Sequence, residues 1–138
     1  MIRPARPAAT TGGVINDVVE LRLPADSAYL AVLRTATAGL AARLDFTLDE
    51  IEDLRIAVDE ACALLLADSE PGEPMVCAFT LGDDSIEVVI SARTGSGRPP
   101  GAGSFAWTVL SALAGEVKAT AGADHLVTIT LLKQRGGT

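Results

Sequence analysis

Residues 46–69 carry the strongest helix signal in the chain. Thr47 and Glu50 form a capping box, in which each side chain satisfies a free amide of the first helical turn. Beyond this start, apolar residues recur at helical spacing, and charged residues occupy most of the remaining circumference. The apolar set is Ile51, Leu54, Val58, Ala61, Cys62 and Leu65. One face of this helix therefore requires a core, and the neighbouring elements are expected to pack against it.

Two elements are predicted before this helix. Alternating apolar and charged side chains in residues 19–23 predict a strand with one buried face, which Pro24 ends. Asp26 is placed to cap a helix that runs to about Arg43. The apolar stripe of that helix is Leu30, Leu33, Thr37, Leu40, Ala41 and Leu44. The short link to the main helix predicts that the two helices pack as neighbours.

Further strands and one helix are predicted after it. Residues 75–81 and 86–91 read as two strands joined by a tight turn, which makes a hairpin. Residues 92–103 are rich in Gly and Pro and predict a mobile loop. Ser104 is placed to cap a third helix that ends near Ala114. The last strands are residues 116–120 and 126–133.

This order of elements defines the expected fold class. A strand, two helices, a hairpin, a helix and two further strands suit an α/β two-layer sandwich. Its sheet is expected to be mixed but mostly antiparallel, with three helices on one face. Residues 17–133 form one domain of ordinary size, between a disordered leader at 1–16 and a frayed tail at 134–138.

Composition excludes several functional classes. No apolar run approaches the roughly 20 residues needed to span a membrane, and residues 1–16 lack the apolar core of a secretory signal. We therefore expect a cytoplasmic protein that makes no membrane contact. The net charge of -7 argues against direct nucleic-acid binding, because such binding rests on Lys and Arg that neutralise phosphates. Cys62 and Cys77 show no metal-ligand spacing, so buried reduced thiols are favoured over a disulfide or a site, and no metal site is expected.

Three segments in this order resemble the RsbW and SpoIIAB type of anti-sigma factor. They are AVDEACALLL in the second helix, ARTGSG after the third strand and SFAWTVLSALAGEV in the third helix. The resemblance covers about residues 17–133, and the first two helices look closest to the actinobacterial members. It implies the Bergerat, or histidine kinase-like ATPase, fold and a homodimer. It also implies two activities: sequestering an alternative sigma factor, and using ATP to phosphorylate a serine on a STAS-domain anti-anti-sigma factor.

The metal-binding motif of these kinases is altered in this chain. The family places a Glu, which orients or deprotonates the attacking group, four residues before an Asn that helps to hold Mg²⁺. Glu60 matches the Glu and is interpreted as a vestigial general base, but Leu64 stands at the Asn position. Leu64 has no oxygen to offer a cation that requires oxygen ligands. A solvated or paired surface acid is the alternative interpretation of Glu60.

The two glycine boxes of the family are altered as well. The first box retains Gly95 and Gly97 but has Arg93 where an Asp accepts a hydrogen bond from adenine. Arg has only donors, and a donor facing adenine in a dry pocket would cost roughly 1 to 3 kcal/mol. The second box has Ser104 and Ala106 in place of glycines, and each added side chain restricts the approach of phosphates to a helix N-terminus. These positions therefore predict a degenerate ATP site.

Three other side chains are candidates for functional roles. Arg34 stands where the resemblance implies an arginine that contacts both the sigma factor and the anti-anti-sigma factor, and its place off the apolar stripe leaves it open to solvent. The alternative is a solvated helix arginine. Trp107 is assigned to the core or an interface in preference to a base-stacking platform. His125 has no partner at diagnostic spacing and is given no catalytic role.

The sequence thus predicts a cytoplasmic anti-sigma factor that acts by binding. Its expected partners are an alternative sigma factor and a STAS-domain anti-anti-sigma factor, and no cofactor is expected. One alternative is an active serine-protein kinase of the same family that uses ATP and Mg²⁺ through atypical contacts. Another alternative, from a different class, is a regulatory scaffold dimer that no longer recognises a sigma factor.

Overall fold

The computed structural model describes residues 10–11, 14–15 and 17–136 of the chain. Two 3-10 turns, η1 and η2, accompany its helices and strands. The elements are β1 Thr10–Thr11, β2 Val14–Ile15, β3 Asp17–Pro24, η1 Ser27–Tyr29, α1 Leu30–Arg43, α2 Leu48–Leu66, β4 Pro74–Leu81, β5 Ser85–Arg93, α3 Phe105–Ala114, β6 Glu116–Ala121, η2 Ala123–His125 and β7 Leu126–Gln134. None of the helices in the described residues is long and apolar enough to cross a membrane.

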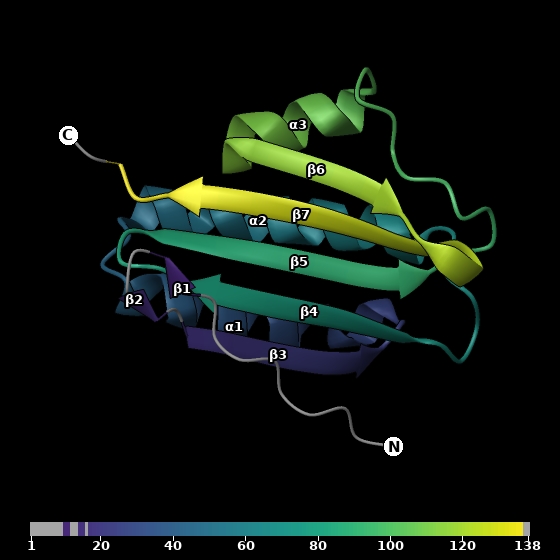
Figure 1. Cartoon of the computed structure of the whole chain (residues 1–138), viewed down its shortest axis with the longest axis horizontal. Helices are drawn as coiled ribbons and strands as arrows, with labels where there is room; N and C mark the ends of the chain where they lie inside the picture. The colour runs from purple at the N-terminus through teal and green to yellow at the C-terminus, as the bar shows by residue number, and fades with distance from the viewer. Residues whose placement is uncertain (1–9, 12–13, 16, 137–138) are drawn as a thin grey trace.

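The fold is a two-layer sandwich, as predicted. Five strands form one sheet in the order β3-β4-β5-β7-β6, and the three helices cover one of its faces (Figure 1). Every pairing between described strands is antiparallel, so the sheet there has no mixed character. The other face of the sheet carries no helix (Figure 1). The predicted fold class is therefore confirmed.

The helix starts follow from the capping residues. The amide of Glu50 donates to Thr47 Oγ1 at 3.1 Å, and the amide of Thr47 donates to Glu50 Oε1 at 2.8 Å, which completes the capping box of α2. The Asp26 carboxylate accepts from the amide of Ala28 at 2.9 Å and caps the 3-10 turn η1. The predicted cap of α1 at Asp26 is therefore wrong, because η1 precedes α1 and the residue before α1, Tyr29, makes no side-chain cap. A cap satisfies amides that have no partner within the element, and so defines where α2 and η1 begin.

The core lies between the helices and the sheet, with α2 against β5 and β7 and between α1 and α3. The predicted apolar face of α2 is buried, except for the half-buried Ile51. Strands β4 and β5 bury every second residue, as strands with one covered face do. The largest fully buried side chains are Phe79, Leu33, Leu54, Leu65, Met75, Ile86, Ile90, Leu110, Ile129, Leu131, Val58 and Val88. Burying one such side chain contributes about 1.5 to 3 kcal/mol.

Strand β3 is less buried than its alternating pattern predicts. Val19, Leu21 and Leu23 pack against the core but are only half-buried. The reason is the strand order, because β3 lies at the edge of the sheet and has a neighbour on one side only. The alternation of apolar residues indicates a covered face but does not indicate the position of a strand within the sheet.

The structure differs from the expected loop and ends of the domain. Ala92 and Arg93 belong to β5 instead of a mobile loop. Most of the predicted leader lies outside the described residues, and its described part pairs β1 with β2. Beyond β7, Arg135 Nη1 donates to the carbonyl oxygen of Leu44 at 2.8 Å, and the Gly136 amide donates to the Glu50 carboxylate. The start of the predicted tail is therefore bound to the turn between α1 and α2.

Candidate functional site

Glu60 and Leu64, the two positions that the resemblance assigns to a metal-binding motif, lie one turn apart on α2 and share a helix face. Glu60 is exposed, and no hydrogen bond or ion pair to its side chain is found among the described residues. Leu64 is half-buried and packs against the core cluster. The side chain at the Asn position is thus held by apolar contacts and offers no oxygen to a cation. No group of three or more His, Cys, Asp or Glu side chains within the described ranges is arranged to hold a metal ion.

Arg93 does not take the position expected for a residue facing adenine. Alternate residues of β5 are buried beneath the helices, and Arg93 falls in the other set. Its Nη1 lies 3.7 Å from Glu73 Oε2, and both side chains are partly exposed. The expected donor inside a dry pocket is therefore not observed. Arg93 still lacks the carboxylate that the resemblance implies at this position as an acceptor for adenine.

The two retained glycines lie in residues 94–97, which we term the glycine turn. Thr94 is 2% exposed, and its Oγ1 accepts from the amide of Gly97 at 2.9 Å. Gly97 has a φ of +66°, a conformation that favours glycine. The turn is thus closed by a buried hydroxyl that the sequence reasoning missed. Its signal is a threonine at the end of a strand, which is too common to be diagnostic.

Asp68, just beyond the C-terminus of α2, is the main contact of the glycine turn and was also missed. Its Oδ2 accepts from the Ser96 amide at 3.0 Å and from the Ser96 hydroxyl at 2.6 Å. Its carbonyl oxygen accepts from the Gly95 amide at 2.7 Å. The hydrogen bonds from the Ser96 side chain and then the Ser96 amide hold the pKa of this carboxyl below its usual range. These contacts tie the glycine turn to α2.

His125 adds a third segment to this cluster. Its carbonyl oxygen accepts from the Thr94 amide at 3.0 Å, and its ring lies beside Gly97, where an added Cβ would come within 3.0 Å of it. Asp124 and His125 both have positive φ values, of 58° and 61°. Non-glycine residues rarely adopt this conformation, and it persists where surrounding contacts impose it. The predicted absence of a catalytic role for His125 stays a prediction, and the structure gives it a packing role.

Ser104 and Ala106, the positions that the resemblance assigns to the second glycine box, lie at the start of α3. The hydroxyl of Ser104 accepts from the Trp107 amide at 3.2 Å and donates to the Gly101 carbonyl oxygen at 2.8 Å. The predicted cap of α3 is therefore confirmed, and this hydroxyl is engaged within the chain. Ala106 and Trp107 are half-buried. Phe105, between the two altered positions, is 83% exposed.

Arg34 lies on α1 and is paired with α2. Its Nε lies 3.0 Å from Oδ1 and 2.8 Å from Oδ2 of Asp59. The Arg34 side chain is 43% exposed, and that of Asp59 is 32% exposed. Within the described part of the chain, Nη1 and Nη2 of Arg34 have no acceptor. The outer edge of the guanidinium therefore presents two donors to solvent, in the fork geometry that suits a carboxylate.

The structure brings some of these positions together in two separate groups, each joined to α2. Gly95 and Gly97 are joined to the end of α2 through Asp68, and Arg34 is joined to the middle of α2 through Asp59. Arg93 stays outside both groups. Cys62 and Cys77 are buried free thiols, as predicted. Burial raises the pKa of the Cys62 thiol to about 12 and also raises that of Cys77, so neither thiol is a nucleophile near neutral pH.

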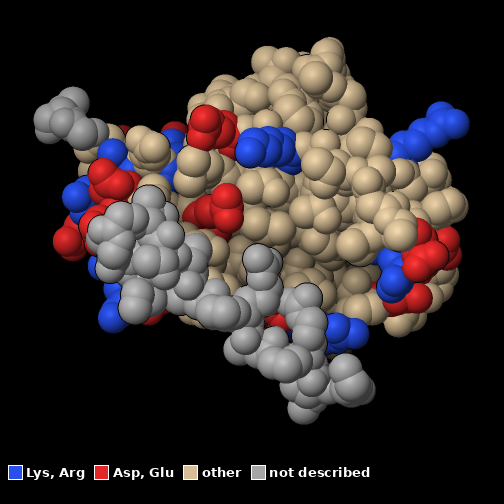
Figure 2. Space-filling view, viewed as in Figure 1, with Lys and Arg blue, Asp and Glu red and all other residues tan. Residues whose placement is uncertain are grey.

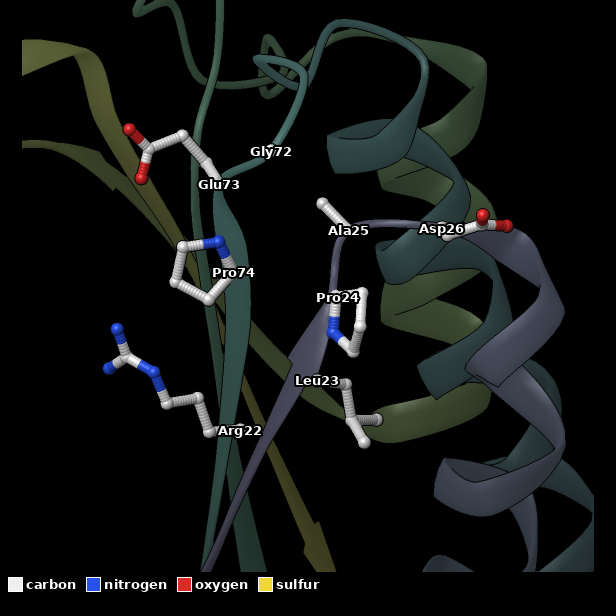
Figure 3. Close-up of a pocket in the computed structure, with 8 residues that line it drawn as sticks. All are labelled: Arg22, Leu23, Pro24, Ala25, Asp26, Gly72, Glu73 and Pro74. Carbon is white, nitrogen blue, oxygen red and sulfur yellow. The ribbon is translucent and has the colours of Figure 1, made fainter.

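A pocket of about 550 Å³ opens at the end of β3 and β4, and Glu73, the ion-pair partner of Arg93, is one of its lining residues (Figure 3). The side chains of Arg22 and Glu73 point away from the helices there, whereas that of Leu23 points toward them (Figure 3). The lining residues are Arg22, Leu23, Pro24, Ala25, Asp26, Gly72, Glu73 and Pro74. None of the predicted site residues lines this pocket, so it is no part of the candidate site.

The fold and the arrangement of these positions define the class of protein. The chain belongs to the histidine kinase-like ATPase domain family, whose sequence model matches residues 23–125. The match spans α1, α2, the glycine turn and α3, and so includes both groups of candidate residues.

The particular relatives are of the RsbW type. The chain is 35% identical over 86 residues to the serine-protein kinase RsbW of Bacillus pumilus, an alignment that covers 58% of this chain and 52% of that protein. It is 35% identical over 79 residues to the serine-protein kinase RsbW of Bacillus subtilis, which covers 54% of this chain and 49% of that protein. The matches thus span about half the length of these curated relatives. The predicted resemblance to the RsbW type is confirmed.

A solved structure shares the fold. The crystal structure of the RsbU and RsbW domains of a Mycobacterium tuberculosis protein superposes with a TM-score of 0.65. The alignment has 17% sequence identity and covers 87% of this chain and 33% of that one. This similarity supports the fold and carries no residue roles.

Proposed function

We propose that this protein is a cytoplasmic anti-sigma factor that binds and sequesters an alternative sigma factor. A STAS-domain anti-anti-sigma factor would release the sigma factor by competing for the same protein. The observation that carries the proposal is the geometry of Arg34. Its Nε is held by Asp59 and its side chain is 43% exposed. The sequence resemblance implies that Arg34 matches a partner-contacting arginine of RsbW-type anti-sigma factors.

The proposal includes a degenerate ATP site, so that the protein acts by binding alone. Four observations support this part. Leu64 provides no oxygen ligand, Arg93 pairs with Glu73, Ser104 is engaged as a helix cap, and Ala106 replaces a glycine. The residues at these positions do not fit a magnesium nucleotide, because neither an oxygen for the metal nor an acceptor for adenine is present.

Millimolar Mg-ATP is expected neither to raise the melting temperature of this protein nor to support serine phosphorylation of a STAS-domain partner. A ligand at 100 times its Kd would stabilise the fold by roughly 2.7 kcal/mol, so binding would be easily seen. The measurement is a thermal unfolding scan with and without Mg-ATP, together with a phosphate-transfer assay. The Bacillus subtilis RsbW serves as the positive control. A clear thermal shift, or phosphate transfer, would favour the active-kinase alternative.

The proposal also includes a homodimer formed through the uncovered face of the sheet. Figure 2 shows this face in the orientation of Figure 1, with a broad surface over the central strands that few charged side chains interrupt. Most half-buried residues of β4, β5 and β7 on this face are small or apolar, and Glu87 of β5 is the acidic exception near the turn end of the strand. The small or apolar residues include Val76, Ala78, Val89, Ser91, Thr128, Thr130 and Leu132. Removing such a surface from water costs little free energy, because few polar groups lose their hydration. The surface is therefore suited to packing against a second copy of the chain.

Light scattering at micromolar concentrations is expected to give twice the chain mass of 14.2 kDa. Val89 lies opposite Ala78 and Thr130 in the middle of this face, so Val89→Lys should produce the monomer mass by placing a charge at the centre of the interface. Val32→Lys, on the outside of α1, is the matched control and should remain dimeric. A wild-type monomer across this concentration range would contradict the dimer.

A further inference from the structure

Three segments that are distant in the chain meet at the glycine turn. Asp68 comes from the end of α2, residues 94–97 come from the end of β5, and His125 precedes β7. Ser69 and Thr94 also form an isolated β-bridge. This cluster lies outside the surface around Arg34, and the proposed binding of a sigma factor makes no use of it.

All four amides of the glycine turn have acceptors within the chain. The Thr94 amide donates to His125, the Gly95 and Ser96 amides donate to Asp68, and the Gly97 amide donates to the Thr94 hydroxyl. A glycine-rich turn binds an anion through free amides that converge on it. Here the Asp68 carboxylate already accepts hydrogen bonds from one of these amides and from the Ser96 hydroxyl. The anion at this turn is therefore a side chain of the protein itself.

We propose that Asp68 is an internal latch, whose carboxylate takes the place of a bound anion and holds the glycine turn closed without any nucleotide. The latch joins the start of residues 95–104, the connection to α3, to the end of α2. The latch does not depend on which partner the protein binds. The inference therefore goes beyond the proposed function. Losing the negative charge of Asp68 opens the turn.

The latch also accounts for the retained glycines. At Gly95 an added Cβ would lie 3.1 Å from Asp68 Oδ1, and at Gly97 it would lie within 3.0 Å of the His125 ring. Both distances are tighter than ordinary van der Waals contact. The positive φ of Gly97 adds a second requirement for glycine there. The G-x-G pattern is therefore explained by packing within the chain, and a phosphate ligand is not needed to explain it.

Amide hydrogen exchange followed by NMR on the full chain tests the latch. The wild-type Ser96 amide should be protected, and Asp68→Ala should lower its protection about tenfold or more, because a hydrogen bond to a charged acceptor is lost. Ser96→Ala keeps the amide but removes the hydroxyl bond, and should have a smaller effect. Glu70→Ala, which removes a nearby exposed acid, is the matched control and should match the wild type.

Acidification of the wild-type protein provides a second, independent test of the latch, with Asp68→Asn as its control. Asp68 faces the Ser96 hydroxyl and amide, the Gly95 amide and His125, and these groups lower its pKa in the folded protein. A depressed pKa means that the latch is intact above the ordinary carboxyl range and is lost as the pH falls through the lowered value. The protection factor of Ser96 should therefore fall on acidification in the wild type but stay constant in Asp68→Asn. Amides of β5 report whether the fold persists.

Each outcome of these measurements either supports or overturns the latch. Loss of Ser96 protection in Asp68→Ala, with core amides still protected, supports the latch. Equal protection in Asp68→Ala and wild type, or an unprotected Ser96 amide in the wild type, overturns it. If Asp68→Ala does not fold, Ser96→Ala and the wild-type pH series decide the question. No sigma factor enters the measurement, so failure of the latch is distinguishable from failure of the proposed function.

Discussion

Arg34→Ala is expected to weaken binding of the sigma factor by about 2 to 5 kcal/mol, which is roughly 30-fold to 5000-fold in Kd. Much of this loss arises because an acid on the partner would be left buried without its cation. Folding should change far less. The Arg34–Asp59 pair is partly exposed on both sides, and such surface pairs contribute at most about 1 kcal/mol.

The expected loss rests on the geometry of the guanidinium. Asp59 accepts from Nε through both carboxylate oxygens, which orients the plane of the Arg34 side chain before a partner arrives. The two terminal nitrogens have no acceptor among the described residues, and the side chain is 43% exposed, so they can donate to one carboxylate at the same time. A preoriented fork loses less conformational entropy on binding than a free side chain does.

Two variants make this prediction specific. Arg34→Lys retains the charge but not the fork, and should recover only part of the lost affinity. Arg43→Ala removes an exposed arginine from the last turn of the same helix and should leave affinity nearly unchanged. The measurement is affinity for the co-purified sigma factor, with unfolding followed in parallel. Wild-type affinity in a well-folded Arg34→Ala variant would contradict the site and direct the search to Glu60 and residues 92–103.

Phe79→Ala is expected to lower the free energy of unfolding by about 3 to 5 kcal/mol, a large share of the stability of a domain of this size. Phe79 lies in β4 between Val19 of β3 and Val88 of β5, and it is fully buried beneath the helices. The loss combines the transfer of the removed atoms to water with the cavity that remains. Denaturant unfolding monitored by circular dichroism measures it.

Phe105→Ala is the matched control for this prediction, because it removes the same atoms from a side chain that is 83% exposed. It should change the free energy of unfolding by less than about 0.5 kcal/mol. Equal losses in the two variants would mean that Phe105 is covered in solution. A small loss in Phe79→Ala would mean that the core between β4 and the helices collapses around the missing ring.

Much of the fold was predictable because its signals are local. The capping box at Thr47 and Glu50, the cap at Ser104 and the alternation in β4 and β5 each involve residues within a few positions of one another. These hydrogen bonds and spacings depend only on residues close in the chain, and not on tertiary contacts. The element order, the hairpin and the helix boundaries therefore follow from the chain itself.

The candidate site was less predictable, for geometric reasons. The residues at the metal and glycine positions were identified by resemblance, but their placement was not. Arg93 was expected in a pocket, yet the strand continues through this position and turns its side chain toward Glu73. Asp68 was missed because a single acid at the end of a helix has no diagnostic pattern. Its role depends on Ser96, which lies 28 positions away.

The sequence by itself determined the three helices, the five strands of the main sheet, the capped starts of α2 and α3 and the buried stripes. Tertiary structure alone decided that β3 lies at the sheet edge, that Asp59 holds Arg34 and that Arg135 binds the carbonyl oxygen of Leu44. The last two contacts join residues 25 and 91 positions apart. Spacing along the chain sets only short-range contacts, whereas a pairing across such separations exists only after the helices have packed on the sheet.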